Sequence, residues 1–272
     1  MNKLIQISTI VLCLIISQLP STVAAQTEKQ KPPLLKIAVS ANFSHTLAKL
    51  LPQFEADTGI KTQVFIGSTG SLFLQLSHGA AYDIFLAADT LRPKRLVEDN
   101  LALPNSLKTY AFGQISFWSS TWNNSENLPS LAALLQQLHN DKPRLAIANP
   151  NIAPYGVAAK QMLKHNHLWK SLSTNRLITG SNINQTFQQV RSGAVSLGVV
   201  ANSQLIENNL TGIAIPTSTY QVIEQQLVII NSSKLKQQAQ ALSQYLLSEN
   251  SQALIEHNGY YGVNHTLTSS AH

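Results

Sequence analysis

Short apolar runs alternate with segments of helical period along most of the 272-residue chain. Between the runs, apolar residues recur three and four positions apart, as at Leu47, Leu50 and Phe54. This alternation favours an α/β fold whose mainly parallel or mixed sheets are covered by helices on both faces. The predicted strands are Leu35–Val39, Gln63–Ile66, Asp83–Ala87, Ile115–Ser119, Leu145–Ala148, Ser196–Val200 and Leu227–Ile230.

The order of these segments predicts two lobes. The last strand comes late and is followed only by helix, so we expect the chain to leave a first lobe near Gly113 and return to it near Tyr220. The first lobe then spans 34–113 and 221–265, the second spans 114–220, and a cleft lies between them. Ligands prefer such clefts and the carboxyl ends of strands. Pro52 lies inside the first predicted helix and should bend or shorten it.

The N-terminal 25 residues have the pattern of a cleavable signal peptide. A positive start precedes the apolar run Ile10–Ile16, and Val23–Ala24–Ala25 is a small-residue cleavage signal before Gln26. Cys13, the only cysteine, lies in the apolar run after Leu12, whereas a lipoprotein cysteine needs a small residue before it. We predict an exported chain without disulfides, with a flexible leader at 26–33 and a disordered tail at 266–272.

Composition excludes several classes of function. The chain has 19 Lys and Arg against 13 Asp and Glu, and the basic residues are scattered rather than interleaved with aromatic residues in a stripe, so nucleic acid is not an expected partner. No segment approaches the ~20 apolar residues of a membrane span. The histidines, among them His45, His78 and His257, show no ligand spacing with carboxylates or cysteine, so we expect neither a metal-cation site nor a cofactor.

Four short loops share one chemistry, because each opens a predicted helix and none contains Lys, Arg, Asp or Glu. Helix N-termini present unpaired N–H groups and the positive end of the helix dipole, so four of them facing one point would bind an anion without charged side chains. The loops are Ala38–Ser44, Gly67–Ser71, Ala153–Gly156 and Gly180–Asn184.

Each loop also has an ordinary structural interpretation. Asn42 or Ser44 can be a plain N-cap, the Gly67–Ser71 loop a plain turn, Tyr155 a packed ring and Ile183 a core residue. The second loop lacks the Gly–Lys–Ser/Thr ending of a P-loop and the Gly–x–Ser–x–Gly of a nucleophile elbow. A secreted serine hydrolase using Ser68 or Ser71 therefore stays a remote alternative without a motif.

The absence of carboxylates in the loops bears on the choice of anion. Phosphate near neutral pH often keeps a proton, since the second pKa of a phosphoryl group is about 6, and its site then needs an acceptor. Donors alone suit a proton-free tetrahedral dianion such as sulfate, molybdate or tungstate. Asp83 and Asp89 flank the third strand, where they cap turns or else position a lobe or contact a permease.

The chain resembles the periplasmic molybdate-binding proteins of ABC importers, which have the type II periplasmic binding protein fold. The resemblance spans about Leu34 to Val263. It is carried by Ala41–Phe43, Gly67–Gly70, Gly79–Asp89, Asn149–Gly156 and Ser192–Gly198.

The resemblance implies a monomeric, non-enzymatic periplasmic protein that closes over one molybdate or tungstate ion and delivers it to an inner-membrane ABC permease. A sulfate, phosphonate or other oxyanion binder is the alternative within the same class. The implied ligand contacts are Ala41, Asn42, Thr69, Tyr155 and Ile183, with Ser40, Ser68 and Ser181 as further candidates. Molybdenum would be present only as the oxyanion, with no protein atom bound to the metal.

Two positions depart from the common pattern of that family. Many members carry serine where Asn42 stands, and many place a tyrosine ligand where this chain has Ala201. A subgroup with Asn in the first loop and Tyr in the third resembles this chain more closely. The resemblance therefore implies that Tyr155 supplies the hydroxyl that Ala201 lacks.

Overall fold

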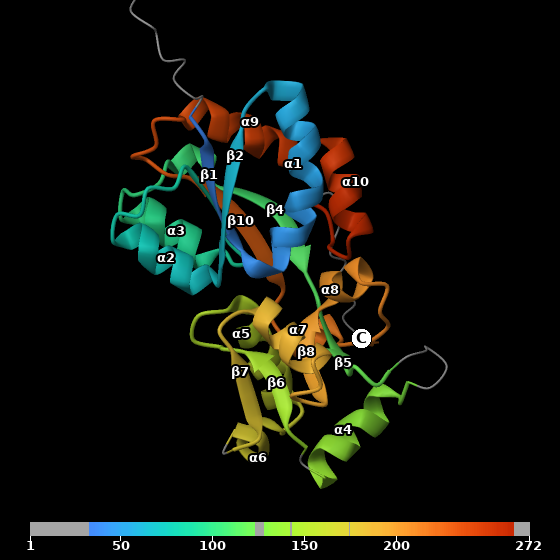
Figure 1. Ribbon diagram of the computed structural model, residues 1–272. Helices are drawn as coiled ribbons and strands as arrows, with labels where there is room; N and C mark the ends of the chain where they lie inside the picture. Colours follow the sequence, from blue (N-terminus) through green and yellow to red (C-terminus); the bar gives the residue numbers. More distant parts are fainter. Residues whose placement is uncertain (1–32, 123–127, 142, 174, 264–272) are drawn as a thin grey trace, which may run out of the picture. The chain divides into compact units, whose positions relative to one another are not determined.

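The computed structural model describes residues 33–122, 128–141, 143–173 and 175–263. The predicted signal peptide, its cysteine, the tail 266–272 and all of the leader except Pro33 lie outside the described residues. The described strands form two five-stranded sheets, which we call sheet A and sheet B (Figure 1). Each sheet with its flanking helices is one lobe, so the expected two-lobed α/β class is confirmed.

Sheet A is mixed. Its strand β1 runs parallel to β2 and β3, whereas β10 runs antiparallel to β3 and β4. The late strand β10 thus returns to the sheet that the chain began. In spatial order the strands are β2 (Thr62–Gly67), β1 (Leu35–Ser40), β3 (Ile84–Leu86), β10 (Ile223–Ile229) and β4 (Lys108–Gly113).

Helices cover both faces of sheet A. Successive residues of β1 point to opposite sides of the sheet, so each face presents apolar side chains that a helix buries. Ile37 and Val39 pack with the helices of one face, and Ala38 packs with those of the other. The first face carries α1 (Ser44–Thr58), α9 (Lys236–Leu246) and α10 (Glu249–His257), and the second carries α2 (Thr69–Ser77) and α3 (Leu91–Glu98). Short 3-10 turns lie at η1 (Ala41–Phe43), η2 (Pro104–Ser106) and η4 (Thr217–Thr219).

Sheet B is also a mixed sheet, with a strand order of its own. Its strand β6 runs parallel to β7 and β8, whereas β5 runs antiparallel to β8 and β9. In spatial order the strands are β7 (Leu177–Gly180), β6 (Leu145–Ala148), β8 (Leu197–Ala201), β5 (Ile115–Trp118) and β9 (Ile213–Ala214).

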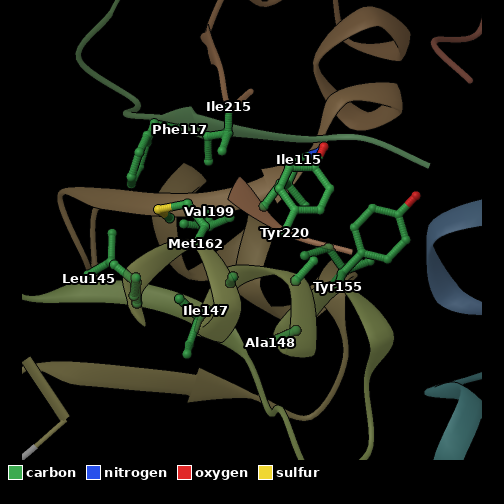
Figure 2. Packing of buried hydrophobic residues seen from close by; sticks show 14 of the residues in the cluster. Ile115, Phe117, Leu145, Ile147, Ala148, Tyr155, Met162, Val199, Ile215 and Tyr220 are labelled. Carbon is green, nitrogen blue, oxygen red and sulfur yellow. The ribbon is translucent and has the colours of Figure 1, made fainter. Parts of the chain in front are cut away.

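The helices of sheet B are again divided between its two faces. The larger apolar cluster lies where Leu145 and Ile147 meet α4 (Leu131–Asn140), α5 (Pro154–His165) and α6 (Trp169–Ser173) (Figure 2). On the other face, Ala146 and Val200 meet α7 (Ile183–Arg191) and α8 (Asn202–Glu207). In Figure 2 the ring of Tyr155 lies at the margin of the first cluster, with its hydroxyl pointing away from the apolar side chains.

The chain crosses between the sheets twice. It leaves sheet A after Gly113 and enters sheet B at Ile115, and it returns between Ala214 and Ile223. Gly113 and Ile223 are paired partners where β4 meets β10, so the two crossings lie side by side. The numerical limits that the sequence predicts for the lobes stay a prediction.

Pro52 does not shorten α1, which was one of the two outcomes expected of it. The helix continues to Thr58, with Pro52 exposed and with Leu51 and Phe54 buried on either side of it. Packing of this apolar face outweighs the one backbone hydrogen bond that proline removes. Within the described ranges, every helix is too short or too polar to cross a membrane.

Candidate functional site

The four uncharged loops converge on one small pocket. Its cavity volume is about 10 Å³, which is close to the ~10–15 Å³ that a single water needs. In this conformation the pocket has no room for an organic solute such as an amino acid or a sugar. No charged residue is among those that line it: Ser40, Ala41, Asn42, Ser68, Thr69, Ala88, Ala153, Pro154, Tyr155, Asn182 and Ile183.

The first loop follows β1 and forms the single turn η1, which contains Ala41 and Asn42. Neither η1 nor α1 has a side-chain cap. The hydroxyl of Ser44 instead donates to the carbonyl of Ala41 at 2.8 Å. Neither Asn42 nor Ser44 is therefore the plain N-cap that was the alternative interpretation of this loop.

The hydroxyl groups of the second loop have different roles. Ser68 is the N-cap of α2, where its side chain accepts from the N–H of Ser71. Thr69 is 1% exposed, and its Oγ1 lies 2.6 Å from Ser40 Oγ and accepts from the N–H of Ala88 at 3.2 Å. Whichever of the two hydroxyls donates to the other, the Ser40–Thr69 pair keeps one proton that it can give to a ligand.

The third loop enters α5 through Ala153, which provides no side-chain cap, and Pro154 at the first helical position. Tyr155 follows and is almost fully buried. Burial, together with the neighbouring hydroxyls of Tyr260 and Tyr110, raises the pKa of Tyr155 well above its usual range. The phenol is therefore protonated at any physiological pH and remains a donor.

The fourth loop leads into α7. Asn182 is its N-cap and accepts from the N–H of Gln185 at 3.0 Å. Ile183 is buried at the first helical position, where its N–H has no partner within the described residues. Ser181 is exposed, does not line the pocket, and gives its own N–H to Gln185.

A buried polar network behind Asn42 is not predictable from the sequence. Its Nδ2 lies 2.7 Å from Gln225 Oε1 and 3.3 Å from the Tyr155 hydroxyl, and its main-chain carbonyl accepts from Tyr260 at 2.7 Å. Gln225 also accepts from Tyr110, at 3.4 Å. These partners come from α5, β4, β10 and the segment after α10, so no short motif contains them.

Several hydrogen bonds join loops of sheet A to loops of sheet B around the pocket. The N–H of Gly70 donates to the carbonyl of Ile152 at 2.8 Å. Asn184 donates to Ser44 at 3.3 Å. On the outer side, Thr46 donates to Glu207 at 3.0 Å. Burial raises the pKa of the Glu207 carboxyl, although Thr46, His45 and Lys49 oppose part of this rise.

Two larger hollows border the pocket, and both carry charge. One, of about 270 Å³, is lined by Asp89 and Glu224 beside Arg92, and carboxylates make it a poor site for an anion. The other, of about 190 Å³, is lined by His45, Arg191 and Glu207. The small pocket, which has donors and no carboxylate, therefore suits an anion better than the hollow lined by Asp89 and Glu224.

The two aspartates that flank β3 have different surroundings. Asp83 is buried and accepts from the N–H of Lys36 at 2.7 Å and from Ser233 at 2.6 Å, which are contacts within the first lobe. Asp89 accepts from the N–H of Arg92 at 3.0 Å in the first turn of α3 and pairs with its guanidinium. Arg92 also reaches the carbonyl of Asn151 in the second lobe at 3.5 Å.

The other interpretations that the sequence left open find little support. Ser68 donates to Ser71, at 2.7 Å, and within the described ranges no histidine hydrogen bonds to either. No group of three or more His, Cys, Asp or Glu side chains is arranged to hold a metal ion in the described part of the chain. Ala201 is fully buried at the end of β8 and does not line the pocket.

A small, uncharged pocket lined from two α/β lobes defines the chain as a solute-binding protein of the periplasmic type. A family model described as bacterial extracellular solute-binding protein matches residues 35–261. The chain belongs to this family.

Relatives within the family share much of the chain. The molybdate-binding protein ModA of Azotobacter vinelandii is 35% identical over 230 residues, which cover 83% of this chain and 89% of that protein. The ModA of Rhodobacter capsulatus is 30% identical over 224 residues, covering 82% and 86%. A solved structure of the Azotobacter vinelandii periplasmic molybdate-binding protein is 33% identical, covers 83% of this chain and 98% of that chain, and has a TM-score of 0.77.

Proposed function

We propose that this protein captures molybdate, and also tungstate, for an inner-membrane ABC importer. The observation that carries the proposal is the pocket formed by four helix-opening loops that bears donors and no charged side chain. Two relatives, 35% and 30% identical over more than four fifths of this chain, are molybdate-binding proteins.

The lining favours an oxyanion without protons. Tyr155, the Ser40–Thr69 pair and the N–H of Ile183 are donors, and no carboxylate lines the pocket to accept a proton from a protonated phosphate. Helix N-termini add their positive ends without adding a cation. Molybdate and tungstate, which have nearly the same size and charge, meet this requirement.

Sulfate is the alternative ligand, since it is also a proton-free tetrahedral dianion. It is smaller, so in a pocket of fixed shape some donors would remain unpaired. Each buried donor without a partner costs about 1–3 kcal/mol, and two such losses would discriminate about 100-fold or more.

We assign the ligand contacts to the N–H of Ala41, Asn42, the Thr69 hydroxyl, the Tyr155 hydroxyl and the N–H of Ile183. Each of these residues lines the pocket. Ser40 supports Thr69, and Ser68 caps α2, so both act indirectly, whereas exposed Ser181 is omitted from the set. In this proposal Tyr155 supplies the hydroxyl that Ala201 lacks, and no cofactor takes part.

The protein is a binding protein rather than an enzyme in this proposal, as its relatives are. It works as a monomer in the periplasm after export by the N-terminal signal peptide, and it hands its anion to a permease. Periplasmic location is supported by the relative of solved structure, which is a periplasmic protein.

Thermal unfolding across an anion panel tests the proposal, with molybdate, tungstate, sulfate, phosphate and a phosphonate compared at equal ionic strength against chloride. A ligand at 100 times its dissociation constant adds about 2.7 kcal/mol to the free energy of unfolding. We expect molybdate and tungstate to raise the melting temperature most. A rise with sulfate but none with molybdate would overturn the assignment.

A further inference from the structure

We propose that Gly113, which does not line the pocket, is a positioning residue that fixes the Tyr155 hydroxyl for the anion. The inference rests on the proposed function, since it gives that hydroxyl a ligand to hold. It links the first crossing between the sheets to the affinity of the site.

The evidence is the space around Gly113. A Cβ atom built there would lie 2.9 Å from Tyr155 Cζ and closer still to its hydroxyl oxygen. Real Cβ atoms essentially never approach other heavy atoms below 3.0 Å. The phenol therefore occupies the volume that any side chain at position 113 would need.

The backbone at position 113 does not itself require glycine. Gly59, Gly79, Gly193 and Gly259 are the glycines with positive φ in the described part of the chain, and Gly113 is not among them. Alanine at 113 is thus free of backbone strain, and its effect falls on the side chain that it meets.

Tyr155 has few alternative positions. Its ring belongs to the apolar cluster of sheet B (Figure 2). Its hydroxyl lies 3.3 Å from Asn42 Nδ2 in the first lobe. Displacement by a Cβ at 113 moves the phenol away from the crossing and breaks its alignment with Asn42. The ring rather than the backbone has to shift, because the Cβ meets a side chain at this position.

The position of this contact has a consequence for lobe motion. Gly113 ends β4 at the first crossing, and its partner Ile223 begins β10 at the second. The Cβ position at 113 is also 3.4 Å from Ile223 Cγ2. The phenol is therefore seated against the first crossing, which is paired with the second, and a change in the geometry of that crossing changes where the hydroxyl points.

A double-mutant cycle of Gly113→Ala and Tyr155→Phe tests the inference, with molybdate affinity measured by calorimetry. Each single substitution should weaken binding, by about 10- to 100-fold for Tyr155→Phe, because a hydrogen bond to a charged ligand is lost. If Gly113 acts through the hydroxyl, the double variant should bind within about threefold of Tyr155→Phe alone. Independent effects that multiply would overturn the inference.

Gly262→Ala is the matched control, because a Cβ there would also meet a side-chain oxygen, that of exposed Glu256, and Gly262 does not line the pocket. It should leave the affinity unchanged. The same cycle measured on urea unfolding of the ligand-free protein should also be non-additive. If the two substitutions are coupled in urea unfolding but the wild type does not bind molybdate, the proposed function is overturned. If the wild type binds molybdate but the two substitutions are additive in both cycles, the role of Gly113 is overturned.

Discussion

The amide nitrogen of Gly70 lies 2.8 Å from the carbonyl oxygen of Ile152, which joins the first turn of α2 to the loop that leads into Tyr155. The bond runs from backbone to backbone between the two lobes. A Cβ at position 70 would lie 2.8 Å from this carbonyl oxygen and 2.9 Å from the Ile152 Cα. The two loops can approach this closely only with glycine at position 70.

Gly70→Ala should therefore weaken molybdate binding without unfolding the protein. The new methyl group meets backbone atoms of the opposite loop, so the lobes must stay further apart at the pocket. We expect at least a tenfold loss of affinity, about the effect of one lost hydrogen bond to a charged group. Small-angle scattering should show less compaction on adding ligand than in the wild type, and equal compaction with equal affinity would contradict the prediction.

Two substitutions of Thr69 should distinguish the contribution of its hydroxyl to binding from the contribution of its shape. Thr69→Val keeps the shape but leaves Ser40 and the N–H of Ala88 without their shared partner. We expect it to weaken binding by about 10- to 100-fold, whereas Thr69→Ser should stay near wild type. If calorimetry gives the same affinity for both variants, the second loop contributes only backbone groups.

Glu207 should make stability depend on pH. Burial raises its folded-state pKa above the usual value of 4.5, so the folded protein binds a proton more readily than the unfolded chain. Stability is therefore greatest below that value, falls as pH rises through the window up to the raised pKa, and stays lower above it. Glu207→Gln keeps an oxygen for Thr46 and removes this dependence.

Urea unfolding of the wild type and Glu207→Gln at about pH 4 and about pH 7 checks this sign. The free energy of unfolding of the variant, relative to that of the wild type, should be higher at about pH 7 than at about pH 4. The same pair in a His45→Gln background removes the contribution of the neighbouring histidine. A difference that shrinks as pH rises would contradict the interpretation.

Asp83 should matter for stability and not for the anion. Asp83→Ala leaves the N–H of Lys36 and the hydroxyl of Ser233 unpaired in a buried place, which costs about 1–3 kcal/mol of unfolding free energy. Asp57→Ala, which removes only an exposed bond to Gln53, should cost less than about 0.5 kcal/mol. Weaker molybdate binding by Asp83→Ala would show a role in the site that its contacts do not suggest.

The central strands could be predicted from sequence because they are buried on both faces. The run Leu145–Ala148 is β6 with the predicted bounds, and all four of its residues are buried. The three strands that were missed, Lys108–Gly113, Leu177–Gly180 and Ile213–Ala214, all lie at sheet edges. These edge strands are partly exposed to solvent and lack a continuous apolar run, although the edge strand β2 was predicted from Gln63–Ile66.

The loops of the site were predictable because each is local in sequence. What lies behind them was not, since Gln225 and Tyr260 are more than 180 residues from Asn42. Asn182 lines the pocket and Ser181 does not, and this difference depends on where α7 begins. Asn182 is the N-cap, so the residue before it lies outside the pocket.

The uncharged lining of the pocket has a consequence for how a bound ion leaves. Amides and aliphatic hydroxyls do not titrate in the physiological range, and the phenol of Tyr155 has its pKa raised further out of it. Titration of the lining itself therefore gives no means of ejecting the ion. Release of the ion then requires a conformational change that separates the loops, so that water hydrogen bonds to their donors.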